Sequence, residues 1–413
     1  MKGLARRLFS EELSWLRVVA IGAGILSYLR AARLPNAWAA TQATTTYQNG
    51  FIKRGLLGSI LSWINMPAVD YERFAIASVV FMAALLVVFA FTVRKLGTLR
   101  STWGVCSAAI LLSSFAFSFL AHLIGYLDIP ILLLGCLTFW PKKPAERIAA
   151  IVLCTVLGLL FHELYLLAVL PFSLFGYWYA VLRDETTRIK MRLAASLIPI
   201  GGAVGMLGYL AIPKAENTSM ANFLASSALG NANYMPRLDF YPLLYRPLAT
   251  NWQIVWSGFH EKGWPPDQIF GILTYGFTVA ALLVIGLSQM KRQLSGKRLQ
   301  LARWLLFVCS LAPVGLIFIA VDDYRWFALA TFSTFFCVAA VLERPASEPL
   351  PWQLRTCLTV VMLNLITSGD LYDKAMPEGF PFRGLFRTPS VESPRTPPQS
   401  SIQPNPYRRN PTE

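Results

Sequence analysis

FAIASVVFMAALLVVFAFTV, residues 74–93, contains no charged side chain. An α-helix rises about 1.5 Å per residue, so this run can cross the roughly 30 Å hydrocarbon core of a bilayer. Arg73 and Arg94 bound it and place positive charge at both ends. The run therefore predicts a transmembrane helix, which decides the class of fold for the rest of the chain.

The composition of the whole chain supports the same class. Of its 413 residues, 55% are hydrophobic and 14% are charged, against about 25% charged residues in an average soluble domain. So few charges cannot cover the surfaces of two or three soluble domains. A soluble enzyme, a disordered protein and a disulfide scaffold are disfavoured, and a polytopic membrane protein is expected.

Further apolar runs predict an all-α bundle of about 10 or 11 transmembrane helices. The last run is short and doubtful as a span. Besides residues 74–93, the expected spans are Trp15–Leu34, Gly104–Leu120, Asp128–Trp140, Ile148–Phe161, Leu164–Leu182, Leu193–Ile212, Ile269–Leu287, Trp304–Val321, Trp326–Leu342 and Cys357–Ser368.

The distribution of Lys and Arg predicts the orientation. Residues 1–15 and the short connections after alternate spans hold 20 Lys and Arg, whereas the short turns on the other side hold one. Because basic loops stay in the cytoplasm, the N-terminus should be cytoplasmic. The basic, Ala-rich, compact design favours a bacterial inner membrane. The net charge of +15 is explained in the same way, so no nucleic-acid partner is expected.

The predicted organisation is one transmembrane domain over residues 1–368 followed by a Pro-rich disordered tail over 369–413. Two long connections, 31–73 and 213–267, fall on the outer side. The first contains GLLGSILSWINM at Gly55–Met66, which is typical of an interfacial helix. The second is rich in Tyr and Trp, which favour the headgroup region.

Ionisable residues occupy the three short outward turns, next to apolar helix ends. These groups are costly at membrane depth and usually face a cavity or a partner, so we expect a shared outer cavity. The residues are His122 with Asp128, His162 with Glu163, and Asp322 and Asp323 with Arg325.

Carboxylates in these turns are candidates for a general base. Glu163 near an apolar wall should have a raised pKa, which suits it to take a proton from a hydroxyl group. Asp323 and Asp128 are further catalytic candidates, and Asp322 with Asp323 can hold a divalent cation. For each, helix capping or a local ion pair is the competing interpretation.

Cations of the long loops are candidates for binding phosphate. Lys53 and Arg54 lie together in YQNGFIKRGLLG, and Arg246 stands among aromatic residues of the second loop; Arg325 and His162 complete the substrate-binding candidates with Asp322. Contact with lipid headgroups is the competing interpretation. No cofactor and no transition-metal site is predicted: the six Cys lie in apolar runs, and FHELY lacks the second His of a zinc-protease motif at Leu166.

The layout resembles multi-spanning glycosyltransferases of the GT-C type and bacterial O-antigen and exopolysaccharide polymerases and ligases. The matching elements are KRG at Lys53–Gly55, the His162–Glu163 turn, and DDYR at Asp322–Arg325. The resemblance implies a polyprenyl-phosphate or pyrophosphate sugar donor, a carboxylate base at the outer face and external Arg residues on the phosphates. It also implies membrane lipids and envelope polysaccharide assembly proteins as partners.

One departure shifts the resemblance toward the polymerase and ligase type. GT-C enzymes usually carry a key acidic residue early in the first external loop, but no Asp or Glu lies between Ala31 and Arg54. Two other functions stay open. A transporter or lipid flippase would use the broken-helix signal at Pro199 and Gly201-Gly202, and an envelope scaffold would use no catalytic residue.

Overall fold

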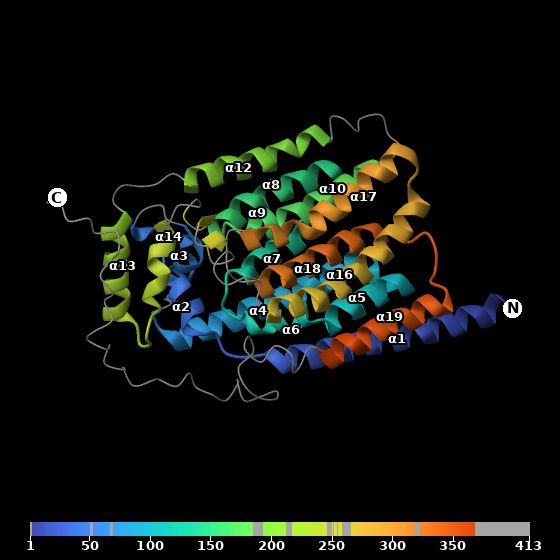
Figure 1. Cartoon of the computed structure of the whole chain (residues 1–413), viewed down its shortest axis with the longest axis horizontal. Coiled ribbons are helices and arrows are strands. Elements are labelled where there is room, and N and C mark those ends of the chain that lie inside the picture. The colour runs from blue at the N-terminus through green and yellow to red at the C-terminus, as the bar shows by residue number, and fades with distance from the viewer. Residues whose placement is uncertain are drawn as a thin grey trace.

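The computed structural model describes residues 2–49, 53–66, 69–184, 193–211, 217–245, 250, 252–253, 255–257, 266–318 and 323–367, and these residues form helices and no β-strand. The all-α class is therefore confirmed for the described part of the chain. Figure 1 shows an elongated bundle whose long helices run side by side.

The helices of the first half are α1 (Lys2–Ala31), α2 (Ala37–Ala43), α3 (Gly55–Trp63), α4 (Tyr71–Lys95), α5 (Thr102–Ser113), α6 (Phe115–His122), α7 (Asp128–Leu137), α8 (Pro144–Phe161), α9 (Tyr165–Ala168) and α10 (Leu170–Arg183). Those of the second half are α12 (Leu197–Ala211), α13 (Asn217–Asn231), α14 (Tyr241–Tyr245), α16 (Pro266–Gln293), α17 (Gly296–Leu311), α18 (Asp323–Leu342) and α19 (Pro351–Thr367). Short 3₁₀ turns are η1 (Tyr47–Asn49), η2 (Thr98–Arg100), η3 (Leu238–Phe240) and η4 (Ala312–Phe318).

Six helices in the described residues are long and apolar enough to cross a membrane, or up to seven if the pair α5 and α6 is one span bent by 51° at Ser114. The chain is thus an integral membrane protein. Fewer helices meet this length than the ten or eleven expected. One reason is that some apolar runs fold into shorter helices, as in α7, which ends after ten residues.

The core forms around α18, which is almost completely buried between α5, α6, α10, α16 and α17. Phe336 of α18 stacks on Phe172 and Phe139, with ring centroids 4.9 and 5.5 Å away. At the periphery, α4 exposes Val80 and Phe91. Exposed apolar faces on long helices suit contact with lipid rather than water.

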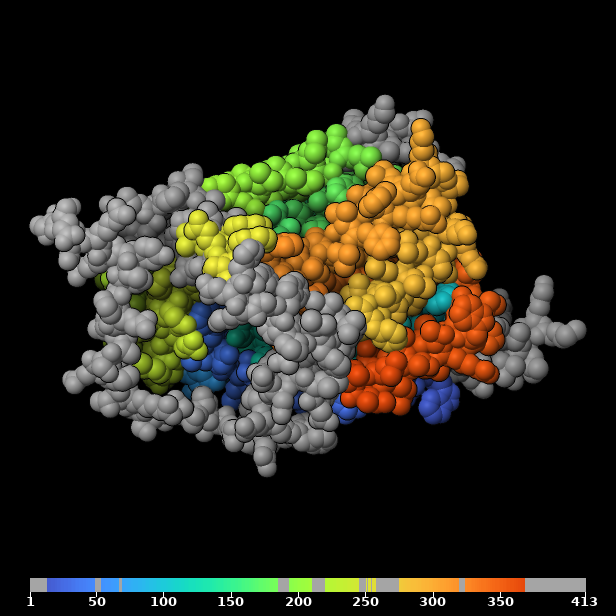
Figure 2. Space-filling view, viewed as in Figure 1, coloured from blue at the N-terminus to red at the C-terminus, as the bar shows by residue number. Residues whose placement is uncertain are grey.

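Described residues of the two long connections meet at one end of the bundle, here named the loop end. Phe240, Tyr241 and Leu244 form a buried cluster with Leu224 of α13, and Trp38 packs against it. The Tyr241 hydroxyl is 2.9 Å from the Thr44 hydroxyl. Figure 1 shows α13 and α14 beside α2 and α3, and Figure 2 shows their surfaces together at the same end.

The helix expected over Gly55–Met66 is present as α3, ending at Trp63. All six Cys are buried and unpaired, as the sequence predicted. The predicted tail 369–413 lies outside the described residues.

Candidate functional site

Arg54 stands at the N-terminus of α3 in a left-handed backbone conformation, with φ at 63°. Residues other than Gly rarely adopt this backbone conformation, and those that do are concentrated at functional sites. Its carbonyl oxygen accepts a hydrogen bond from the Thr45 hydroxyl at 3.1 Å. Gly58 lets the two segments approach, because a Cβ there would lie 2.2 Å from the Thr45 carbonyl oxygen.

Glu163 is presented by a tight turn between α8 and α9. The His162 N–H donates to the Gly158 carbonyl at 2.7 Å, and the Leu164 N–H donates to His162 Nδ1 at 3.1 Å. Gly158 makes room for Tyr165, because a Cβ would lie 2.0 Å from the Tyr165 ring. The turn is thus held by these two hydrogen bonds and by the packing of the Tyr165 ring against Gly158.

Arg54 and Glu163 form a two-point ion pair across this end. Arg54 Nε lies 3.2 Å from Glu163 Oε2, and Nη2 lies 2.5 Å from Oε1. The two side chains keep 15% and 26% exposure, so the pair is accessible. The Arg54 guanidinium also lies 5.9 Å from the ring centroid of Phe240, which brings the second loop to the site.

The charges explain the protonation states. Burial raises the pKa of Glu163, but the Arg54 guanidinium lowers it, and the net pKa lies well below the usual range. The expected raised pKa is therefore wrong for this state of the site, because the expectation lacked Arg54. Burial also lowers the pKa of Lys53, which Arg54 lowers further and Glu163 raises.

His162 is neutral at physiological pH. Burial, helped by Arg54, lowers its pKa to about 4. Because Nδ1 accepts the Leu164 N–H, the proton of the neutral ring belongs on Nε2. Nδ1 also lies 3.2 Å from Glu163 Oε2.

Asp128 and Arg325 form a second two-point pair in the interior. Arg325 Nε lies 2.9 Å from Asp128 Oδ1, and Nη2 contacts Oδ2. Asp128 has no exposed surface, and Arg325 is 6% exposed. The guanidinium carbon lies 5.5 Å from the ring centroid of Tyr126 and 5.2 Å from that of Trp326.

Described residues of the three short turns are connected to one another and to the first long connection. His162 feels the charge of both Arg54 and Arg325, which connects the two ion pairs. His122 contributes its backbone, since its carbonyl accepts from Arg33 Nε at 2.9 Å. Its Nδ1 is buried without a hydrogen-bond partner among the described residues.

Other predicted residues cannot be placed. Asp322 and Arg246 lie outside the described residues. Asp323 begins α18, but its side chain is likewise outside what the structure describes. The described residues contain no group of three or more His, Cys, Asp or Glu that could hold a metal ion.

Three residues of the site were missed in the sequence. Arg33 follows the first span, Asn36 caps α2, and the Tyr126 hydroxyl accepts from Asn36 Nδ2 at 3.1 Å. Tyr126 lies in the same outward turn as His122 and Asp128, which is a signal that could have found it. Comparisons of the chain with protein-family models, with curated proteins and with solved structures found no match.

Proposed function

We propose that the protein is a membrane glycosyltransferase or polysaccharide polymerase that uses a polyprenyl-phosphate- or pyrophosphate-linked sugar at the outer face of the membrane. The accessible Arg54–Glu163 pair with Lys53 beside it carries the proposal. It combines a carboxylate with two cations, which are the groups that transfer from a phosphate leaving group requires.

The resting ion pair is the inactive form of the base. A carboxylate held by Arg has a low pKa and takes protons poorly. When the donor phosphate binds Lys53 and Arg54, it competes with Glu163 for the guanidinium, because phosphate accepts the same two-point contact. Glu163 then loses its nearest counter-charge, burial dominates, and its pKa rises.

The transfer step follows from this exchange. Glu163 takes the proton of the acceptor hydroxyl. At the same time the oxygen of that hydroxyl forms a bond to the anomeric carbon of the donor sugar. The bond from that carbon to the phosphate oxygen breaks, and the electron pair leaves with the phosphate. Lys53 and Arg54 stabilise the charge that develops there.

The other residues have supporting roles. Asp128 holds Arg325 in place, and Arg325 adds positive potential near His162. Neutral His162 shapes the turn through the Leu164 N–H. Asp323 remains a predicted catalytic residue, and Asp322 and Arg246 remain predicted substrate contacts. A divalent cation at the two aspartates also remains a prediction. The proposed location is a bacterial inner membrane with envelope polysaccharide assembly proteins as partners.

The segment at Pro199 and Gly201-Gly202, on which the transporter alternative depends, gives that alternative no support. A Cβ at Gly201 or Gly202 would meet no atom within 4 Å, so these glycines of α12 do not line a close contact.

Glu163→Gln tests the proposal in a strain that lacks the native gene. Loss of a general base lowers rates by about 10² to 10⁴, so we expect lost surface polysaccharide and accumulated lipid-linked sugar at normal protein level. Arg54→Gln should act likewise. Glu146→Gln is the matched control, because Glu146 is exposed and pairs with Lys143. Unchanged polysaccharide in both site variants would overturn the proposal.

A further inference from the structure

A cavity lies at the other end of α8 from Glu163. It has a volume of about 900 Å³ and opens between the C-termini of α4, α10 and α18 and the N-terminus of α8. Cavities of roughly 300–1,000 Å³ are typical of small-molecule sites. This cavity, here named the basic pocket, is lined by six cationic side chains: Lys95, Arg100, Lys142, Arg147, Arg183 and Arg344.

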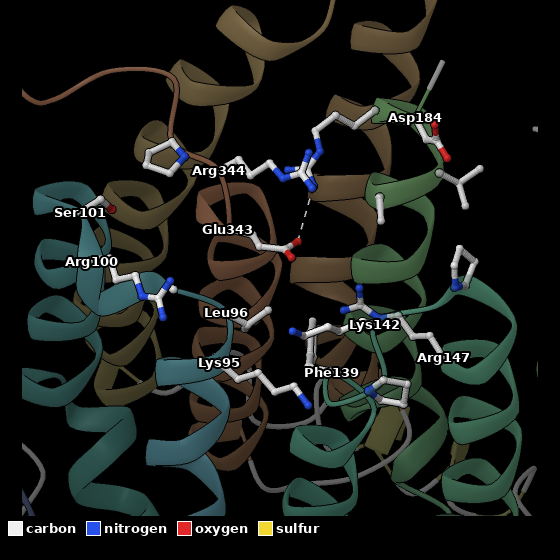
Figure 3. Close-up of a pocket in the computed structure, with 17 residues that line it drawn as sticks. Lys95, Leu96, Arg100, Ser101, Phe139, Lys142, Arg147, Asp184, Glu343 and Arg344 are labelled. Carbon is white, nitrogen blue, oxygen red and sulfur yellow. Dashed lines mark ion pairs between the residues drawn. The ribbon is translucent and has the colours of Figure 1, made fainter. Parts of the chain in front are cut away.

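The carboxylates of the basic pocket do not balance these charges. Two acidic residues line it, Asp184 and Glu343. Glu343 lies 3.6 Å from Arg183 and is partly exposed. Figure 3 shows the five labelled cations, which come from helices and from the turns between them, around a common space. The pocket therefore keeps a positive potential that attracts anions.

Arg147 is the strongest sign of a missing ligand. It is 8% exposed, and its Nε and Nη2 have no hydrogen-bond partner among the described residues. Its guanidinium lies 4.9 Å from the Phe139 ring centroid, and a Cβ at Gly176 would lie 2.9 Å from Nη2. A buried guanidinium with unused donors is costly unless an acceptor reaches it.

We infer that the basic pocket binds a phosphate-bearing ligand, with Arg147 as the buried anchor and Lys142 and Arg100 as outer contacts. Phosphate offers several charged acceptor oxygens, which match the planar fork of Arg and the point charge of Lys. The phosphate can belong to an anionic lipid headgroup, because the pocket lies at the end of membrane-spanning helices, or to a soluble compound. The inference is independent of the proposed transferase.

The full-length protein in detergent allows a direct test. Thermal unfolding is followed with added pyrophosphate against KCl of equal ionic strength, and native mass spectrometry follows retention of phosphatidylglycerol against phosphatidylcholine. Arg100→Gln/Lys142→Gln removes two exposed cations of the pocket. Arg94→Gln/Lys143→Gln is the matched control, because both residues are exposed neighbours that do not line the pocket.

Each outcome decides the inference. We expect about tenfold weaker binding or more in the pocket variant, with the control like the wild type. A selective effect on pyrophosphate supports a soluble ligand, and a selective effect on phosphatidylglycerol supports a lipid. Equal binding by the pocket variant and the control with both probes would overturn it. Arg147→Gln should abolish binding if the variant protein folds. If it does not fold, the Arg100→Gln/Lys142→Gln variant still tests the inference.

Discussion

Arg54 holds both carboxylate oxygens of Glu163 although the two residues lie 109 positions apart in the chain. The contact joins the start of α3 in the first long loop to the turn after α8. Arg54 reaches it from a left-handed backbone conformation. Strained backbone conformations concentrate at binding and catalytic sites. We therefore expect a site that is held for binding, and not for stability alone, to contain a strained residue such as Arg54 beside the candidate base.

Substitution of Arg54 separates strain from function. Arg54→Ala loses the ion pair and keeps the left-handed strain, whereas Arg54→Gly loses the pair and relieves it. We expect Arg54→Gly to be more stable than Arg54→Ala by about 1 kcal/mol, and both to lack transferase activity. Unfolding midpoints in detergent measure the difference. Equal midpoints would show that the backbone at residue 54 relaxes.

Stability should depend on pH through His162. Its pKa is about 4 in the folded protein and about 6.5 when unfolded. The unfolded chain therefore binds an extra proton between these values, so this contribution is complete above pH 6.5 and is lost as the pH falls toward 4. The loss amounts to about 3 kcal/mol.

His162→Asn tests this origin, because Asn keeps an acceptor for the Leu164 N–H and does not titrate. The melting temperature of the wild type should fall from pH 7 to pH 5 more than that of the variant. Parallel curves would contradict a neutral His162. Glu163 contributes in the same direction only below its ordinary pKa of about 4.5, since its folded pKa is depressed.

The sequence predicted the class of fold and the grouping of the outward turns better than it predicted contacts. Long apolar runs are a local signal, and alternation of basic and non-basic turns places every second turn at one end. Pairing is not local. Asp128 was weighed as a helix cap and Arg325 as the partner of a neighbouring Asp, but they bind each other across 197 positions.

The prediction of a raised pKa for Glu163 was wrong for the same reason. An apolar wall raises the pKa of a carboxyl, and burial does act in that sense here. Arg54 outweighs it, and nothing in one sequence pairs residue 54 with residue 163. Arg147 was likewise counted only as one of many basic loop residues, because its burial depends on the packing of α8 against α10.

Gly158 should be required for the turn that presents Glu163. Gly158→Ala places a methyl group against the Tyr165 ring and should cost about 1–3 kcal/mol. Gly202→Ala is the control, since open space surrounds that position. In a Tyr165→Ala background the Gly158→Ala substitution should cost less, because the clash is gone. Equal costs in both backgrounds would place the effect elsewhere.

The Asp128–Arg325 pair should act on folding before it acts on chemistry. Asp128→Asn leaves the buried Arg325 without a counter-charge, which typically costs about 3–5 kcal/mol. We expect a large drop in melting temperature and in monodisperse protein extracted with mild detergent, while Glu163→Gln keeps both near the wild type. Asp128→Asn/Arg325→Gln should recover part of the loss, because two neutral amides can hydrogen-bond without a stranded charge. A stable Asp128→Asn protein that lacks polysaccharide synthesis would instead move Asp128 into the reacting site. The base would then have to be sought inside the bundle rather than at the His162–Glu163 turn.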